Sequence, residues 1–167
     1  EEKLSALRHI FFGGDVLRRQ LIAKLQNLAP TATFVNFYGT TETPQGVGYY
    51  VVPSGMAGKD RDAEMPQREI MPVGKGIHGV QLLVLNAAEK ISGIGELGEI
   101  CVRKPYLSTG YLGNVALTRE KFPINPITDN QGDHYYKTGD LGRYRPDGNV
   151  ELLGRNDAQV KVRGYRI

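Results

Sequence analysis

Hydrophobic residues in the first part of the chain follow two different patterns. The apolar run LRHIFF, residues 7–12, predicts a buried strand that ends at a Gly-Gly pair. Between residues 16 and 28, leucine and isoleucine recur every three or four positions, which predicts a helix with Asp15 as its N-cap and Pro30 as its end. ATFVNFY, residues 32–38, is again typical of a strand. This order favours a parallel βαβ unit, in which ligands bind beyond the carboxyl ends of the strands.

A polar stretch without periodicity, residues 53–72, separates this unit from the rest of the chain. We expect it to be an exposed loop that joins two subdomains. Beyond it, short apolar segments alternate with turn signals, and residues 146–149, PDGN, are a strong hairpin turn. This spacing suggests a small antiparallel barrel or sandwich. The expected strands are residues 80–86, 98–104, 142–145, 149–154 and 159–163.

Composition excludes several classes of protein. No run in the 167 residues approaches the roughly 18 apolar positions of a membrane-spanning helix. The charged N-terminus does not resemble a signal peptide, and the single cysteine, Cys101, fits a reducing compartment, so we expect a cytoplasmic protein. The net charge of +3 has no accompanying run of basic residues with interleaved aromatics. Neither nucleic acid nor a membrane is therefore an expected partner.

Candidate chemistry is concentrated in the segment NFYGTTE, residues 36–42. Thr41 and Glu42 follow a glycine turn, where a hydroxyl and a carboxylate can meet phosphate and a divalent cation. Asp140 follows Gly139, and we expect a tight turn there that lets its carboxylate accept both hydroxyls of a ribose. Arg155 begins a basic, glycine-rich segment that is compatible with phosphate. Together these residues are the parts of an ATP site.

Five segments in this order resemble the adenylate-forming superfamily, which includes nonribosomal peptide synthetase adenylation domains, acyl-CoA synthetases and luciferases. They are LRHIFFGGDVL (7–17), NFYGTTE (36–42), GELGEICVRKPYLSTGYLGN (95–114), YKTGDL (136–141) and GRNDAQVKVRGYRI (154–167).

The resemblance implies an α/β plus β fold, the C-terminal part of the large adenylation subdomain. Residues 1–70 would belong to a partial parallel α/β layer and residues 71–155 to a small distorted β-barrel. Residues 156–167 would contain the hinge and the start of a mobile C-terminal lid, with Asp157 as the hinge residue. The hinge role comes from the resemblance alone, because nothing in the chemistry of Asp157 indicates it.

The same resemblance implies individual roles. Tyr38 would stack on adenine, Thr41 would contact the α-phosphate, and Glu42 would bind Mg²⁺, which makes Thr41 and Glu42 the catalytic pair. Asp140 would bind the ribose and Arg155 would make a second nucleotide contact. The structural alternatives are a packed tyrosine, a solvated glutamate and an aspartate that caps a turn; we expect Glu42 to be exposed. The predicted ATP site also includes Asn36, Phe37, Gly39 and Thr40.

Substrate selection is expected at the strand ends. The positions that match the family's acyl pocket are Ile10, Phe12, Phe37, Gln45 and Gly46. Two phenylalanines would make this pocket apolar and shallow on one side, which argues against a charged substrate side chain. Whether the acid carries an amino or a keto group stays open.

The resemblance therefore implies an enzyme that activates a carboxylic acid with Mg-ATP and transfers the acyl group to the phosphopantetheine thiol of a carrier protein. Thr40 stands where peptide synthetases usually have proline, and residues 37–43, 71–86 and 93–100 are very similar to aminoadipate-reductase-type adenylation domains. That type is one alternative. An acyl-CoA or acyl-AMP ligase and a non-catalytic platform fragment are the others.

We expect the 167-residue chain alone not to catalyse ATP–pyrophosphate exchange. In the family, a Ser/Thr/Gly-rich phosphate loop precedes the matched region and a catalytic lysine lies in the lid beyond it, so the remaining parts of the same adenylation domain are needed as partners. The measurement is exchange of labelled pyrophosphate by the purified chain with a panel of carboxylic acids. Exchange with any acid would contradict both the expectation and the assigned roles.

Overall fold

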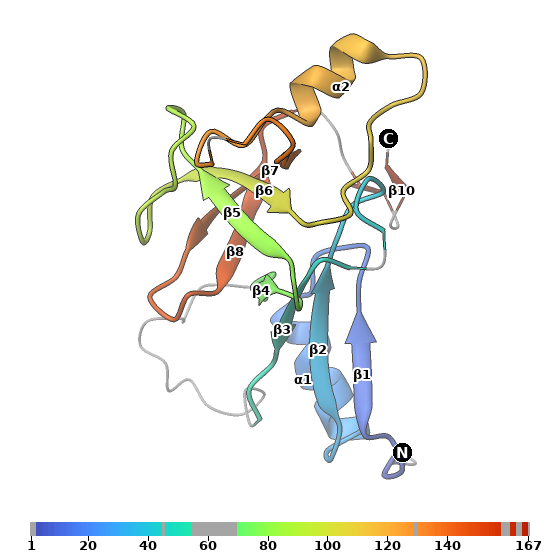
Figure 1. Ribbon diagram of the computed structural model, residues 1–167. Coiled ribbons are helices and arrows are strands. Elements are labelled where there is room, and N and C mark those ends of the chain that lie inside the picture. The colour runs from blue at the N-terminus through green and yellow to red at the C-terminus, as the bar shows by residue number, and fades with distance from the viewer. Residues whose placement is uncertain are drawn as a thin grey trace.

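The first part of the chain forms a mixed sheet with a helix against one face (Figure 1). The structure is a computed structural model that describes residues 3–44, 46–54, 70–128 and 130–157 and the backbone of 161–162 and 165–166. The strand order of the first sheet is β1-β2-β3-β4. The parallel pairing of β1 with β2 confirms the predicted βαβ unit. The elements are β1 (His9–Phe12), α1 (Arg19–Leu28), β2 (Thr33–Tyr38), β3 (Gly48–Val51) and β4 (Lys75–Gly76).

The predicted start of α1 is wrong by about one turn. Asp15 does not cap the helix; its carboxylate accepts a hydrogen bond from the backbone N–H of the next residue, and the N-cap position is Arg18. The residues in between are extended because Leu17 accepts a backbone hydrogen bond from Met71 (2.8 Å) and Arg18 forms a bridge with Ile70. A tertiary pairing thus takes the place of the first helical turn.

The second part of the chain is an antiparallel sheet in the order β5-β6-β7-β8 (Figure 1). The predicted hairpin turn is confirmed, because β7 pairs with β8 and the Arg145 N–H donates to the carbonyl of Asn149 (2.8 Å) across it. The sheet is open: within the described residues no ladder joins β5 to β8. Its elements are β5 (Gln81–Leu85), β6 (Gly98–Arg103), α2 (Val115–Lys121), β7 (Tyr136–Tyr144) and β8 (Val150–Arg155); β9 (Lys161–Val162) and β10 (Tyr165–Arg166) form a separate two-stranded ladder.

Strand β7 is longer than expected and contains Asp140. The sequence indicated a tight turn at Gly139 and a strand over residues 142–145, whereas the ladder runs from Tyr136. Gly139 has φ +78° inside the strand, and the β7–β8 register shifts between Leu141 and Gly142. Such irregularities bend a strand and redirect its side chains, and here they do so beside the Asp140 carboxylate.

Two main clusters of buried residues hold the layers together. One lies between α1 and the first sheet and includes Leu17, Ile22 and Phe34. The other includes Tyr38 from β2 and Ile100 from β6, and therefore packs the first sheet against the second. Among the described residues, neither helix has the length and apolar character needed to cross a membrane.

A glycine just before β4 lies between the backbones of the two sheets. Gly74 exchanges backbone hydrogen bonds with Val150 of β8 (3.1 and 2.7 Å) and lies against the backbone of β3. A Cβ atom at Gly74 would be 1.7 Å from the Tyr49 carbonyl oxygen, so the two sheets can approach this closely only because the side chain is absent.

Replacing Gly74 with alanine in the full-length protein should lower the free energy of unfolding by more than about 3 kcal/mol, because the Cβ atom would overlap backbone. Gly79→Ala is the matched control: Gly79 also has positive φ, +75°, but open space around it, so that change should cost about 1–2 kcal/mol. Chemical denaturation of both variants measures the difference. Equal losses would contradict the close approach at Gly74.

Candidate functional site

A cavity of about 280 Å³ lies between the two sheets, where the segments singled out in the sequence meet. Its walls come from the loop after β1, the carboxyl end of β2, the middle of β7 and the end of β8. The position agrees with the rule that ligands bind beyond the carboxyl ends of parallel strands. The predicted nucleotide contacts that line it are Asn36, Phe37, Tyr38, Gly39, Asp140 and Arg155.

Asp140 is the centre of this cavity's hydrogen-bond network. Its side chain is nearly inaccessible, and each carboxylate oxygen accepts a hydrogen bond: Oδ2 from the Tyr38 hydroxyl and Oδ1 from Nη1 of Arg155, both at 2.6 Å. The backbone N–H of Asp140 donates to the hydroxyl of Thr138 (3.0 Å). A buried carboxylate is stable only when it is paired in this way. The carboxylate of Asp140 in β7 therefore binds one side chain from β2 and one from β8.

The buried end of β2 contributes two polar side chains on the same face as this network. Asn36 donates from its amide to the Pro72 carbonyl (2.8 Å), which fastens the chain that enters the second sheet. Tyr38 is only 5% exposed, and burial, followed by the Asp140 carboxylate, raises the pKa of its hydroxyl well above the ordinary value. The tyrosine hydroxyl therefore stays protonated and can act as a donor at any physiological pH.

Arg155 connects Asp140 to Asp157. Its Nε and Nη2 donate to the two carboxylate oxygens of Asp157, both at 2.7 Å, while Nη1 holds Asp140. The hydrogen bonds with Asp157 are the largest cause of a raised pKa for the guanidinium, so the cation is permanent. One side chain therefore joins the buried carboxylate to the residue where the sequence predicts a hinge.

The turn after β2 is built around a residue that the sequence analysis missed. Thr43 is fully buried, and its hydroxyl accepts a hydrogen bond from the backbone N–H of Thr40 (3.0 Å). The neighbouring Thr41 is exposed, so its hydroxyl is available to a ligand. The available signal was a hydroxyl residue three positions after Thr40, a spacing that suits a side chain closing a turn.

Glu42 is half-buried, which corrects the expectation that it would be exposed. Its Oε1 accepts a hydrogen bond from the Tyr111 hydroxyl (2.8 Å), and its carboxylate also contacts the Tyr136 hydroxyl. Burial, followed by this contact with Glu42, raises the pKa of Tyr136. Two tyrosines from the second part of the chain thus fix the orientation of the glutamate.

The donor set around Glu42 is compatible with Mg²⁺ in a phosphate site. Among the described residues, no cluster of three or more His, Cys, Asp or Glu side chains could hold a metal ion. Mg²⁺ in phosphate sites needs only one or two protein carboxylates, since water and phosphate oxygens supply the other ligands. An oriented glutamate beside the exposed hydroxyl of Thr41 fits that requirement.

Side chains alternate along β1, and this alternation divides the residues predicted for the acyl pocket between two faces of the first sheet. Ile10 and Phe12 pack in the core beneath α1, and the Phe12 ring stacks on Phe34. The Phe37 side chain points to the opposite face of the sheet, although the residue also lines the cavity between the sheets. The ring that does stack on Phe37 belongs to Phe11, with centroids 5.5 Å apart.

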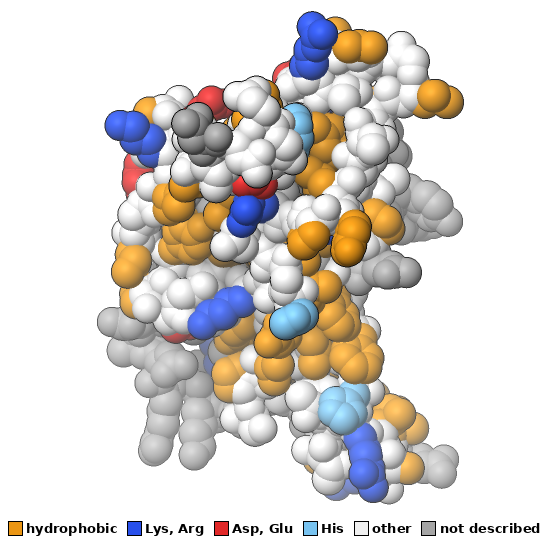
Figure 2. Space-filling view, in the orientation of Figure 1, with side chains coloured by type: hydrophobic (Ala, Val, Ile, Leu, Met, Phe, Trp, Pro, Cys, Tyr) orange, Lys and Arg blue, Asp and Glu red, His pale blue; other side chains and the backbone are white. Residues whose placement is uncertain are grey.

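Phe11, Phe37 and Gly46 therefore share the sheet face that α1 does not cover. Gly46 lies beside the Phe37 ring, which is 3.4 Å from where a Cβ atom at Gly46 would be, and the φ of +75° at Gly46 favours glycine at this position. Phe11 is 60% exposed, and Figure 2 shows hydrophobic side chains gathered where Figure 1 draws β1, β2 and β3. Gln45 lies outside the described residues.

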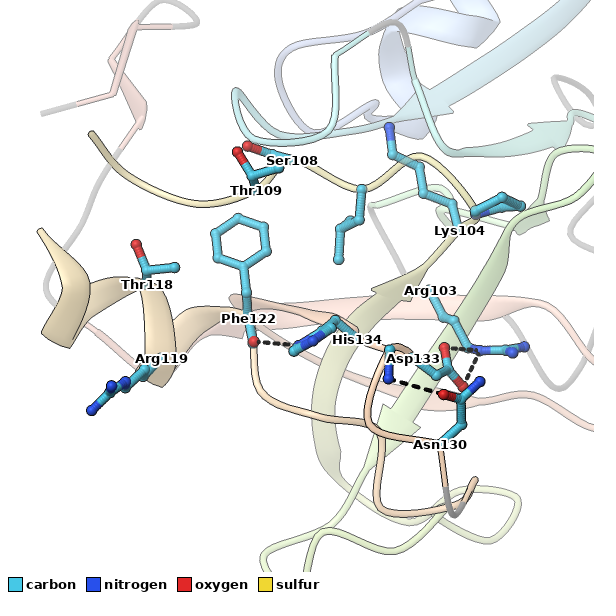
Figure 3. Close-up of a pocket in the computed structure, with 13 residues that line it drawn as sticks. Arg103, Lys104, Ser108, Thr109, Thr118, Arg119, Phe122, Asn130, Asp133 and His134 are labelled. Carbon is cyan, nitrogen blue, oxygen red and sulfur yellow. Dashed lines mark hydrogen bonds and ion pairs between the residues drawn. The ribbon is translucent and has the colours of Figure 1, made fainter. Parts of the chain in front are cut away.

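A second cavity, of about 650 Å³, lies between α2 and β6 (Figure 3). Its charged groups do not converge: Arg103 forms an ion pair with Asp133 (2.8 Å), and Figure 3 shows Lys104 and Arg119 pointing away from each other. His134 places its Nδ1 3.0 Å from the Phe122 carbonyl, as expected of a structural histidine. The smaller cavity between the sheets is therefore the candidate site.

Comparisons with known proteins agree with this choice. The family model described as AMP-binding enzyme matches residues 1–112. The chain is 43% identical to L-2-aminoadipate reductase from Schizosaccharomyces pombe, over 100% of the chain and 13% of that protein. It is 37% identical to a plipastatin synthase polypeptide from Bacillus subtilis, over 99% of the chain and 4% of that protein. The chain thus spans a small part of the relatives it matches.

Solved structures show the same similarity in three dimensions. A nonribosomal peptide synthetase protein containing adenylation and PCP domains, PA1221, superposes with a TM-score of 0.81 at 31% identity, over 98% of this chain and 31% of that one. IdnL1 superposes with a TM-score of 0.84 at 27% identity, over 96% of this chain and 31% of that one. The α/β plus β fold is therefore that of the C-terminal part of adenylation domains.

Phe11 and Phe12 should respond differently to truncation in the full-length protein. Phe12→Ala removes a ring from the core under α1 and should cost about 3–5 kcal/mol of unfolding free energy without changing substrate preference. Phe11→Ala should cost less than about 1 kcal/mol. If the acid binds on this face, Phe11→Ala should shift the preferred acid by about tenfold, toward longer or bulkier chains. Melting temperature and a carboxylate panel, measured on both variants, separate the two faces.

Proposed function

Because the chain belongs to the AMP-binding enzyme family, we propose that it is the nucleotide-binding part of an adenylation domain that joins a carboxylic acid to AMP. The observation that carries the proposal is the cavity where Tyr38, Asp140 and Arg155 meet at a buried carboxylate. Motifs that are about 100 residues apart in the sequence meet there, with hydroxyl, carboxylate, aromatic and guanidinium groups suited to a nucleoside phosphate.

In this proposal the nucleotide lies across the cavity with its sugar on Asp140. The carboxylate has acceptor sites left for the ribose hydroxyls after its contacts with Tyr38 and Arg155, because two oxygens provide about four. The Tyr38 ring, which lines the cavity, gives adenine a surface to stack on. Asn36, Phe37 and Gly39 form the wall beside it, and Thr40 shapes the turn that leads to the phosphates.

The reaction breaks the phosphoric anhydride bond between the α- and β-phosphates of ATP and forms a mixed carboxylic–phosphoric anhydride bond. An oxygen of the substrate carboxylate attacks the α-phosphorus of ATP, the bond to the β-phosphate oxygen breaks, and pyrophosphate leaves with that electron pair. The exposed Thr41 hydroxyl donates to the α-phosphate, where negative charge increases in the transition state. Glu42 would hold Mg²⁺, which neutralises phosphate charge when bound. The contribution of this chain is positioning and charge compensation, and needs no general base.

The acid would bind on the face of the first sheet that carries Phe11 and Phe37, next to Gly46. This face is apolar and exposed to solvent. The chain covers only about a third of the adenylation-domain structure PA1221, so other parts of such a domain can cover the face. We therefore assign the closing of this pocket to the remaining parts of the same domain. The apolar lining supports an acid with an uncharged side chain.

Residues 1–70 and 71–155 correspond in this proposal to the last part of an α/β layer and to the barrel-like subdomain. Asp157 would be the hinge of a lid that begins at residue 156. This assignment rests on the family resemblance; Asp157 accepts two hydrogen bonds from Arg155, which lines the cavity, so movement at residue 157 would change the contacts of a cavity residue. After rotation of the lid, the acyl group would pass to the phosphopantetheine thiol of a carrier protein.

An aminoadipate-reductase-type adenylation domain is the second candidate. Identity to the fission yeast aminoadipate reductase is 43%, compared with 37% for the plipastatin synthase polypeptide. Such a protein would activate its acid by the same chemistry and then, as the relative's name says, reduce it. The two candidates share the site and differ in the acid and in the step after activation.

The test is ATP–pyrophosphate exchange by the full-length protein with a panel of acids that includes 2-aminoadipate. Glu42→Gln should lower exchange by several hundred-fold, which corresponds to roughly 3–4 kcal/mol of transition-state stabilisation. Glutamine keeps an acceptor for Tyr111, so the fold should be retained. The matched control is Glu120→Ala, an exposed glutamate on α2 that should leave exchange unchanged.

Strong preference for 2-aminoadipate would favour the reductase-type candidate, and preference for another acid would favour the peptide synthetase. A full-length protein with no exchange for any acid would reject the activity and leave a non-catalytic platform. Normal exchange by Glu42→Gln would reject the metal role of Glu42.

A further inference from the structure

We propose that the Tyr38 hydroxyl is a positioning group that orients Asp140 toward the nucleotide sugar, and thereby determines how strongly the protein distinguishes ribose from deoxyribose. The inference rests on the proposed function, since it concerns the same cavity. It assigns to the hydroxyl a task that is separate from stacking by the ring. The supporting observation is the 2.6 Å hydrogen bond from this hydroxyl to Oδ2 of Asp140.

The two groups that hold Asp140 differ in how firmly they are themselves held. Tyr38 is at the end of β2, 5% exposed, within the cluster that packs the two sheets together. Arg155 is at the end of β8 and shares its guanidinium with the exposed Asp157. The arginine can therefore keep a carboxylate partner after it leaves Asp140, whereas the tyrosine hydroxyl has a fixed position.

A carboxylate held at only one oxygen can still rotate about its Cβ–Cγ bond. Contacts at both oxygens fix its plane, and this fixed plane presents the remaining acceptor sites of Asp140 to the cavity. A sugar with two adjacent hydroxyls gains from this arrangement, while a sugar that lacks one of them gains less. Loss of the Tyr38 hydroxyl should therefore weaken the binding of ribonucleotides more than that of deoxyribonucleotides.

The Tyr38 hydroxyl is also suited to act as a constant hydrogen-bond donor. It is protonated throughout the physiological range, because burial and the neighbouring carboxylate raise its pKa. It therefore keeps the proton that it donates to Asp140, and it does not become a second negative charge beside the carboxylate. A phenylalanine at position 38 would keep the ring and remove only this donor.

The experiment compares Tyr38→Phe with the wild type in the full-length protein, by calorimetric titration of AMP and of 3′-deoxy-AMP. In the wild type, AMP should bind more tightly than its deoxy analogue. In Tyr38→Phe this preference should fall by about tenfold, the ratio that one hydrogen bond to a charged group supplies, with the affinity for 3′-deoxy-AMP nearly unchanged. The same change should appear in kcat/KM for ATP against 3′-deoxy-ATP.

Tyr144→Phe is the matched control. The Tyr144 hydroxyl also bonds within the second sheet, to the backbone of Leu82 and Val84, and the residue does not line the nucleotide cavity. Removal of the Tyr144 hydroxyl should lower the melting temperature and leave the preference for AMP over 3′-deoxy-AMP unchanged.

An unchanged sugar preference in Tyr38→Phe, with both affinities reduced equally or not at all, would overturn the inference while leaving the proposed function standing. A Tyr38→Phe protein that fails to fold would show that the hydroxyl serves the fold, and would also overturn it. A wild-type protein that binds neither nucleotide would overturn the inference together with the proposed function.

Discussion

The arrangement of the two sheets depends on one buried negative charge. Asp140 lies in β7, its tyrosine donor in β2 and its arginine donor in β8, so the carboxylate is compensated only when all three strands are in place. Leaving such a charge without partners costs several kcal/mol, more than most single contacts contribute. Gly139, with its positive φ, bends β7 directly before Asp140. The contact between β2 and β7 at Asp140 also brings the Tyr38 ring against the second sheet.

The elements predicted correctly are those with a local cause. The parallel strands, the helix between them and the 146–149 hairpin each follow from periodicity or turn chemistry within a few residues. The errors have tertiary causes. The helix starts late because Leu17 and Arg18 pair with a segment more than 50 residues away, and β3 and β4 were not predicted because they are short, glycine-containing strands defined by their neighbours.

The predictions for the site also depend on whether a residue's role has a local cause. Motif order singled out several residues that line the cavity between the sheets, but it could not assign the faces of β1, because the strand His9–Phe12 shows no clear alternation of polar and apolar residues. Ile10 and Phe12 were predicted from the family resemblance, and the structure adds that Phe11, not these two residues, stacks on Phe37. The contact between Tyr111 and Glu42, 69 residues apart, leaves no local signal at all.

The close backbone contact at Gly74 also affects how such proteins can be recombined. The partners of this glycine are backbone atoms of β3 on one side and of β8 on the other, so the fit depends on the absence of a side chain at position 74 and not on which side chains surround it. A chimera that takes β4 and the second sheet together from a relative should tolerate a junction just before Gly74 whenever the glycine is kept. Compatibility between donor and recipient would then be decided at the Tyr38–Asp140 contact, where side chains from both halves must match.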